Sequence, residues 1–314
     1  MKKTVFVPVI LMTLFLFCGI QEDRISAAFD AEFLTRPDGY KGLKKHYNFS
    51  FSKKPIQMDP GLMYKSVSSG AVDVIDGFAT DGRIESYGLR VLRDDKNFFP
   101  PYYAAPLIRQ ETLEKYPEIE KVLSLLAGKL PDSTMQRLNF LVDEKNMKAG
   151  ETAEKFLKES GLLDMKPVAS GLEGSLTIGS KHFTEQEILG QMMAMLIEKH
   201  TGLDVDRKLN LGGTIICFNA LKADDIDLYA EYTGTGLVNI LKEEAMNDPD
   251  KTLKKVRNAF EKKYDLVWLM PFGFNNTYTL TMKEEKAEKL GIESISDLAE
   301  VIKSQKKSVD RSDK

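Results

Sequence analysis

Short apolar stretches alternate with longer amphipathic segments along this chain from residue 27 onward. Stretches rich in apolar and β-branched residues predict strands at residues 72–75, 89–92, 176–179, 203–209, 226–229, 266–270 and 277–282. Apolar positions three and four residues apart predict helices at residues 40–47, 62–67, 111–126, 152–162, 252–264 and 295–302, and one that begins at Thr184. This alternation predicts an α/β fold.

Several local signals refine where these helices begin and end. Pro117 predicts a kink or an interruption in the helix that contains it. Thr184 and Glu187 have the spacing of a capping box, in which each side chain binds a free backbone N–H at the start of a helix. Residues 164–175 contain proline and glycine without apolar periodicity, which predicts a linker. The charged tail from Lys303 onward predicts a frayed or disordered end.

Residues 1–18 have the pattern of a bacterial export signal. Two lysines precede an apolar run that is shorter than the roughly 20 residues of a membrane-spanning helix. Cys18 follows this run, where a bacterial lipoprotein is cleaved and acylated, although Phe17 replaces the usual small residue. We therefore expect an exported protein, either in the periplasm or anchored to the cell membrane as a lipoprotein through Cys18. A plainly secreted or signal-anchored protein with an inert Cys18 is the alternative.

The composition limits the classes of function. The 314 residues carry a formal net charge of −3, which gives no reason to expect a nucleic-acid partner. Outside the signal the only cysteine is Cys217, so the mature chain has no internal disulfide. Its apolar helical surroundings predict a buried structural thiol. The three histidines lack metal-ligand spacing, and we expect neither a metal nor a cofactor.

Six motifs, each present once, carry the chemical information. They are FLTRPDG at 33–39, ATDGR at 79–83, FFPPY at 98–102, GSKHFTEQ at 179–186, EYTGT at 231–235 and GFNNTY at 273–278. Together they resemble the substrate-binding proteins of osmoprotectant ABC transporters, which bind glycine betaine, proline betaine, carnitine or choline. The resemblance covers nearly all of the chain after the signal. It implies a two-lobed α/β fold of the type II periplasmic-binding-protein kind.

These motifs stand in a different order from that of the family. The counterpart of residues 176–302 comes first in the family, and that of residues 27–163 follows. We therefore expect a circularly permuted protein whose former ends are joined by residues 164–175, because twelve residues can span up to about 40 Å. Residues 103–275 would form lobe I, including this linker, and residues 26–102 with 276–314 would form lobe II.

The resemblance also implies the ligand site. A quaternary ammonium group has no N–H to donate, so proteins bind it against aromatic faces. The implied cation cage comprises Tyr232, Tyr278, Phe78 and Tyr102, and the implied partners of a ligand carboxylate are Lys181, Arg36 and Thr235. The family often has Tyr in place of Phe78. Since Arg and Lys form strong charge-assisted bonds to carboxylates, the pair of cations favours a betaine, glycine betaine first, over choline.

The leading hypothesis is a non-enzymatic protein that captures a quaternary amine and delivers it to the membrane permease of an ABC transporter. A ligand-binding sensory protein and a non-functional seam of two broken binding-protein genes are the alternatives. An enzyme with the two-lobed architecture of porphobilinogen deaminase needs a cofactor-bearing cysteine in its cleft, whereas Cys217 lies in an apolar helical pattern. The permuted protein would be a monomer or a domain-swapped dimer.

Overall fold

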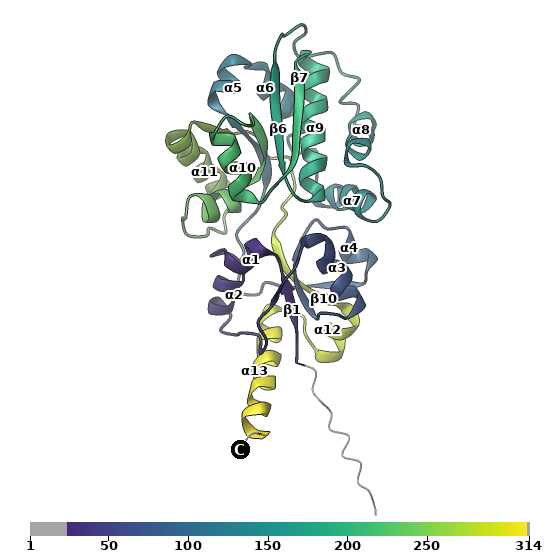
Figure 1. Ribbon diagram of the computed structural model, residues 1–314, viewed down its shortest axis with the longest axis vertical. Coiled ribbons are helices and arrows are strands. Elements are labelled where there is room, and N and C mark those ends of the chain that lie inside the picture. The colour runs from purple at the N-terminus through teal and green to yellow at the C-terminus, as the bar shows by residue number, and fades with distance from the viewer. Residues whose placement is uncertain (1–23, 313–314) are drawn as a thin grey trace, which may run out of the picture.

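Two lobes stacked along the long axis of the molecule form the structure (Figure 1). This computed structural model describes the backbone of residues 24–312 and the side chains of residues 24–306. The predicted signal and Cys18 therefore lie outside the described residues. Each lobe is built on its own five-stranded sheet. The mixed α/β class and the two-lobed arrangement predicted from the sequence are confirmed.

The first sheet lies in the lobe that contains the beginning of the described chain. Its strands are β1 (Ala27–Phe29), β2 (Ile56–Gln57), β3 (Val74–Phe78), β4 (Leu89–Leu92) and β10 (Tyr278–Lys283), in the order β2-β1-β3-β10-β4. Strand β1 is parallel to β2 and β3, whereas β10 is antiparallel to both of its neighbours.

The second sheet repeats this topology. Its strands are β5 (Ala104–Arg109), β6 (Ser175–Lys181), β7 (Asp204–Gly212), β8 (Leu228–Tyr232) and β9 (Leu266–Trp268), in the order β7-β6-β8-β5-β9. Strand β6 is parallel to β7 and β8, and β5 is antiparallel to β8 and β9. In both sheets, therefore, the antiparallel strand occupies the fourth position.

Helices cover both sheets. Around the first sheet lie α1 (Ala31–Thr35), α2 (Tyr40–His46), α3 (Pro60–Ser69), α4 (Arg83–Ser86), α12 (Glu284–Leu290) and α13 (Ile295–Ser312). Around the second lie α5 (Gln110–Lys115), α6 (Glu118–Leu123), the 3-10 turn η1 (Ser124–Leu126), α7 (Asp132–Asp143), α8 (Ala149–Glu159), α9 (Thr184–Thr201), α10 (Thr214–Lys222), the π-helical turn η2 (Thr235–Ile240) and α11 (Pro249–Tyr264). None of the described helices is long and apolar enough to cross a membrane.

Two segments cross between the lobes side by side. Residues 93–103 connect β4 to β5, and residues 269–277 connect β9 to β10. Tyr103 and Asn275 form an antiparallel bridge between them, and the backbone N–H of Asn276 donates to the carbonyl of Tyr102 at 3.1 Å. Each crossing segment also places one strand in a sheet whose other strands lie far away in the sequence.

Pro117 interrupts its helix as predicted. Helix α5 ends at Lys115, and Pro117 is the residue that precedes α6, so the predicted helix at 111–126 consists of two short helices and a 3-10 turn. Proline cannot donate a backbone hydrogen bond within a helix, which explains the break. The predicted helix at 40–47 is also confirmed, since α2 spans Tyr40–His46.

Two predictions about helix ends were wrong. Thr184 forms no capping box, because its hydroxyl donates to Asp143 of α7 at 2.5 Å and α9 has no side-chain cap. The tail after Lys303 continues α13 to Ser312. Packing explains the second error: the side chain of Gln305 accepts a hydrogen bond from the backbone N–H of Ile25, and Lys306 donates to Ser50. Tertiary contacts therefore extend a helix that its charged sequence did not favour.

Candidate functional site

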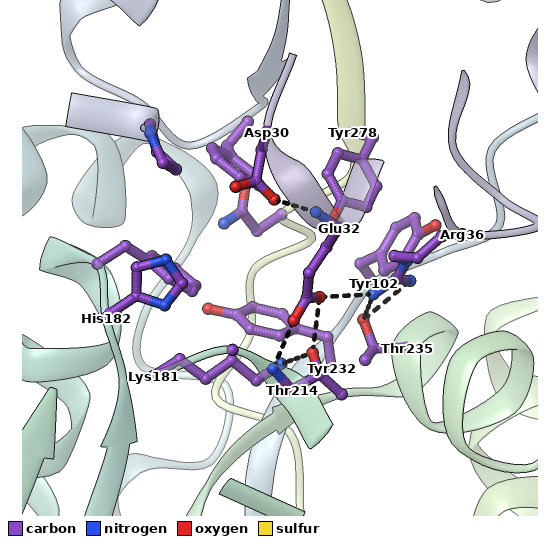
Figure 2. Close-up of a pocket in the computed structure, with 15 residues that line it drawn as sticks. Asp30, Glu32, Arg36, Tyr102, Lys181, His182, Thr214, Tyr232, Thr235 and Tyr278 are labelled. Carbon is purple, nitrogen blue, oxygen red and sulfur yellow. Dashed lines mark hydrogen bonds and ion pairs between the residues drawn. The ribbon is translucent and has the colours of Figure 1, made fainter. Parts of the chain in front are cut away.

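One pocket between the lobes is lined by every ligand-binding residue that the sequence predicts. Its lining comprises Asp30, Glu32, Arg36, Pro60, Phe78, Tyr102, Lys181, His182, Phe183, Gly213, Thr214, Tyr232, Thr235, Asn276 and Tyr278. Its empty space is about 510 Å³, including the part open to solvent at the mouth. This volume suits a small organic molecule. Figure 2 shows aromatic and charged side chains that converge on it from both lobes.

The fold brings these side chains together because most of them lie at strand ends that face the opposite lobe. Lys181 is the last residue of β6, and Tyr232 is the last residue of the parallel strand β8. Phe78 ends β3, and Tyr278 begins the antiparallel strand β10 directly opposite it. Tyr102 lies in the first crossing segment. Ligands of open α/β sheets commonly bind at such strand ends.

Five aromatic rings form a continuous cluster in this pocket. The ring centroid of Tyr278 lies 5.5 Å from those of Phe78 and Tyr102. Phe183 lies parallel to Phe78 at a centroid distance of 5.8 Å, and 6.3 Å from Tyr232. Phe183 thus connects the predicted rings of the two lobes. Phe183 was not predicted as a site residue, although it stands inside the GSKHFTEQ motif.

Arg36 is buried and already paired. Its Nε and Nη2 atoms donate to the two carboxylate oxygens of Asp38 at 2.8 and 2.6 Å. Its Nη1 atom donates to the Thr235 hydroxyl of the other lobe at 3.2 Å. The guanidinium also lies 5.3 Å from the ring centroid of Tyr278 and 6.0 Å from that of Tyr102. The predicted carboxylate partner therefore directly adjoins the predicted cation cage.

Lys181 is paired in the same way. Its ammonium donates to Glu231 at 2.6 Å and to the Thr214 hydroxyl at 3.0 Å, and it lies 5.1 Å from the ring centroid of Tyr232. Both Lys181 and Glu231 are buried. Lys181 therefore lies on the same side of the pocket as Tyr232, and its ammonium contacts Thr214, the first residue of α10.

Glu32 reaches across from α1 to the other lobe. Its carboxylate accepts from the backbone N–H of Thr214 at 2.6 Å and from the Thr214 hydroxyl at 3.0 Å. Burial alone would raise the pKa of Glu32, but the charges of Lys181 and Arg36 together with the hydrogen bonds from Thr214 outweigh burial, so this pKa lies below its ordinary value. A Cβ atom at Gly213 would stand 2.3 Å from Glu32 Oε1, so this approach needs glycine there.

Internal acids therefore neutralise both predicted carboxylate partners. Asp38 holds Arg36, Glu231 holds Lys181, and Glu32 lies near both. These three acids were not predicted as site residues, because separation along the chain does not reveal which charges meet in the fold. Position offered one signal: Glu32 stands four residues before Arg36, where the two side chains share a helix face.

Cys217 is a buried structural thiol, as predicted. It lies in α10, and burial raises its pKa to about 12. At pH 8 only about one thiol in ten thousand is then ionised, and the thiolate is the reactive form. We expect iodoacetamide to leave Cys217 unmodified in the folded protein and to alkylate it in guanidinium chloride. Peptide mapping by mass spectrometry separates it from Cys18, and rapid alkylation of the folded protein would contradict this expectation.

The chain matches the family model of the substrate binding domain of ABC-type glycine betaine transport systems in two segments, residues 20–159 and 174–313. The chain belongs to this family. Family members bind substrates for transport and are not enzymes. Membership agrees with the two-lobed α/β structure, in which both sheets have the same topology. The circular order of the halves stays a prediction.

Three relatives are each similar in sequence to less than half of this chain. The carnitine transport binding protein OpuCC of Listeria monocytogenes is 38% identical over 46% of this chain and 47% of its own length. The glycine-betaine-binding protein of Pseudomonas aeruginosa is 40% identical over 44% of each chain. The ergothioneine transport permease/ergothioneine binding protein EgtU of Helicobacter pylori is 43% identical over 42% of this chain and 24% of its own. The matched part of this chain thus spans about half the length of these relatives, or less.

The solved structures that this chain matches include a glycine betaine/carnitine/choline ABC transporter protein. It is 39% identical over 43% of this chain and 49% of its own, with a TM-score of 0.35. The amino acid ABC transporter substrate-binding protein AbpA of Streptococcus pneumoniae is 13% identical over 91% of this chain and 90% of its own, with a TM-score of 0.35.

Proposed function

We propose that this protein is an exported solute-binding protein that captures a quaternary-ammonium osmoprotectant and delivers it to an ABC transporter permease. Glycine betaine is the first candidate, ahead of proline betaine, carnitine and choline. The observation that carries the proposal is the single pocket in which aromatic rings from both lobes adjoin Arg36 and Lys181. The ligands named for the relatives, glycine betaine, carnitine and ergothioneine, all combine a trimethylammonium group with a carboxylate.

The aromatic cluster supplies the part of the site that would bind the cation. Tyr232, Tyr278 and Tyr102 are at least nine-tenths buried, and Phe78 is partly exposed toward the pocket. A desolvated aromatic face stabilises a quaternary ammonium by about 2 kcal/mol. Phe183, between Phe78 and Tyr232, adds a face to the predicted cage of four.

Arg36, Lys181 and Thr235 supply the part that would bind a carboxylate. An ammonium has three N–H donors, and among the described residues Glu231 and Thr214 accept two of those of Lys181. The guanidinium of Arg36 has five, of which Asp38 accepts two, and the Thr235 hydroxyl accepts from Nη1 and Nη2. A ligand carboxylate would therefore approach the remaining donors, close to the place that Glu32 occupies.

The two crossing segments would serve as the hinge. Periplasmic binding proteins close around their ligands by hinge motion, and the pocket here takes residues from both lobes. We propose lobe I at residues 103–275 and lobe II at residues 26–102 with 276–314, in circularly permuted order. In this assignment each lobe contributes one of the two buried cations, Lys181 and Arg36.

Isothermal titration calorimetry with glycine betaine, proline betaine, carnitine and choline tests the proposed function. We expect saturable one-site binding of at least one of these quaternary amines, with a preference for the ligands that carry a carboxylate. Arginine, a cation without a quaternary ammonium group, is the control ligand and should not compete. Absence of binding for all four quaternary amines would refute the proposal.

A further inference from the structure

We infer that Glu185 is a specificity-determining residue of this pocket: its buried carboxylate fixes the ring of Tyr232 and provides the negative charge that a quaternary ammonium ligand balances. This inference rests on the proposed function and deepens it. Neither the six motifs nor the aromatic cluster alone assigns Glu185 such a role, because its carboxylate contacts the hydroxyl of Tyr232 and does not itself line the aromatic pocket.

Four donors surround the Glu185 carboxylate. Its Oε1 atom accepts from the Tyr232 hydroxyl at 2.7 Å and from the side-chain amide of Asn276 at 2.9 Å. Its Oε2 atom accepts from the Thr80 hydroxyl at 2.5 Å and from the amide of Asn139 at 3.1 Å. Glu185 itself is 2% exposed. The carboxylate is thus held between segments of both lobes.

The hydrogen-bond partners of Glu185 favour the ionised form of its carboxylate. The amide of Asn139 also donates to the carbonyl of Thr80 at 2.9 Å, and the amide oxygen of Asn276 accepts from the Thr80 backbone, so both amides present N–H groups to Glu185. A protonated carboxyl group would have to donate to the Thr80 or Tyr232 hydroxyl and would then accept from only three donors. Burial raises the pKa of Glu185, and these hydrogen bonds oppose that shift.

The charge of Glu185 has no basic partner. Among the side chains that the structure describes, no Lys, Arg or His forms an ion pair with it, whereas Asp38 pairs with Arg36 and Glu231 pairs with Lys181. A buried unpaired carboxylate is strongly unfavourable unless an opposite charge comes close. A ligand cation in the neighbouring aromatic pocket would be that charge.

Tyr232 connects this carboxylate to the pocket. Its hydroxyl donates to Glu185 and accepts from the side-chain amide of Gln186 at 3.2 Å, while its ring lines the pocket. Burial and the charge of Glu185 raise the pKa of Tyr232 well above its ordinary value, so the phenol keeps its proton and remains a donor. A hydrogen bond to an anion polarises the phenol toward a more electron-rich ring, which strengthens its attraction for a cation.

The test compares two ligands of the same shape and different charge. Glycine betaine and 3,3-dimethylbutanoate differ in having a quaternary nitrogen or a carbon at the same place. We expect Glu185→Gln to weaken glycine betaine binding by about tenfold or more and to change 3,3-dimethylbutanoate binding by less than about threefold, as loss of a desolvated charge interaction requires. Equal losses for both ligands, or no loss for glycine betaine, would overturn the inference.

Two variants separate charge from other effects. Glu187→Gln removes an acid two residues further along the same helix that makes no described hydrogen bond to Tyr232, and it should leave both affinities within about twofold. A loss equal to that of Glu185→Gln would overturn the inference in favour of a general charge effect. Tyr232→Phe keeps the ring and removes the hydroxyl, and we expect a smaller but still cation-selective loss. Thermal melting without ligand reports whether each variant folds.

A measurement on the unaltered protein does not depend on the folding of any variant. Carbon-13 NMR of side-chain-labelled glutamate, assigned by comparison with Glu185→Asp or by sequential connectivity, reports the ionisation of Glu185 at pH 7. We expect a carboxylate, and a neutral carboxylic acid in the ligand-free protein would overturn the inference. If the unaltered protein binds none of the four quaternary amines, the proposed function fails, whatever the state of Glu185.

Discussion

Replacing Tyr232 with alanine is expected to abolish measurable binding of every quaternary amine. The substitution removes one aromatic face, about 2 kcal/mol or roughly 30-fold in affinity. It also removes one hydrogen-bond donor to Glu185. Phe183 loses its contact with the Tyr232 ring, whose centroid lies 6.3 Å away. Calorimetric titration with glycine betaine and choline should show losses of more than about 100-fold for both, since neither loss depends on a carboxylate.

Controls for this prediction must separate binding from stability, because truncation of a buried aromatic residue destabilises a protein by about 3–5 kcal/mol. Tyr264→Ala removes a tyrosine in the same lobe that packs against Phe218 and Phe260, away from the pocket. It should lower the melting temperature and leave affinity unchanged. Retention of choline or glycine betaine affinity within about threefold in a folded Tyr232→Ala protein would contradict the proposed cage.

Replacing Arg36 with alanine is expected to weaken glycine betaine far more than choline. A hydrogen bond to a charged group contributes about 1.5–3 kcal/mol, which corresponds to roughly 10- to 150-fold in the affinity of a carboxylate ligand. Choline has no carboxylate, and removal of Arg36 leaves the charge of Asp38 unbalanced beside the aromatic pocket. Choline affinity should therefore fall by less than about threefold, measured by the same titrations.

Arg83 provides a matched control for this second prediction. It forms the same bidentate pair with an acid two residues away, since its Nε and Nη2 atoms donate to Asp81 at 2.9 and 2.6 Å, and it is also buried. Arg83 does not line the aromatic pocket. Arg83→Ala should lose comparable stability without selective loss of glycine betaine. Equal losses of glycine betaine and choline in Arg36→Ala would refute the carboxylate role of Arg36.

The sequence predicts the elements of this fold best where one periodicity dominates. The strand at 89–92 is observed at those positions, and the helix beginning at Thr184 is observed as α9. Strand β5, in contrast, has Pro106 near its middle and was not predicted, because proline argues against an interior strand. The carbonyl of Pro106 nevertheless accepts a hydrogen bond from the backbone N–H of Leu269 at 2.9 Å. Such a strand forms because it pairs with strands far away in the sequence, here β8 and β9.

For the candidate site, the motifs identify residues that lie together, and they do not identify what each residue contacts. Tyr232 and Tyr278, 46 positions apart, line one pocket. Which acids pair with Arg36 and Lys181 depends on side-chain rotamers and on the distance between strands. The periodicity of the sequence gives neither. Glu185 lies two residues from Phe183, but only the packing of the two lobes against each other brings Thr80 and Asn276 to it.

Strand β10, late in the chain, belongs to the same sheet as the early strands β1 to β4. This pairing sets the order in which the two lobes can be completed during synthesis. All strands of the second sheet lie between residues 104 and 268, whereas the first sheet lacks a central strand until β10 is made. Before that point, β3 and β4 have no strand between them. The lobe that the ribosome begins first is therefore the one finished last. Long-range pairing of this kind slows folding and leaves strand edges open to other chains meanwhile.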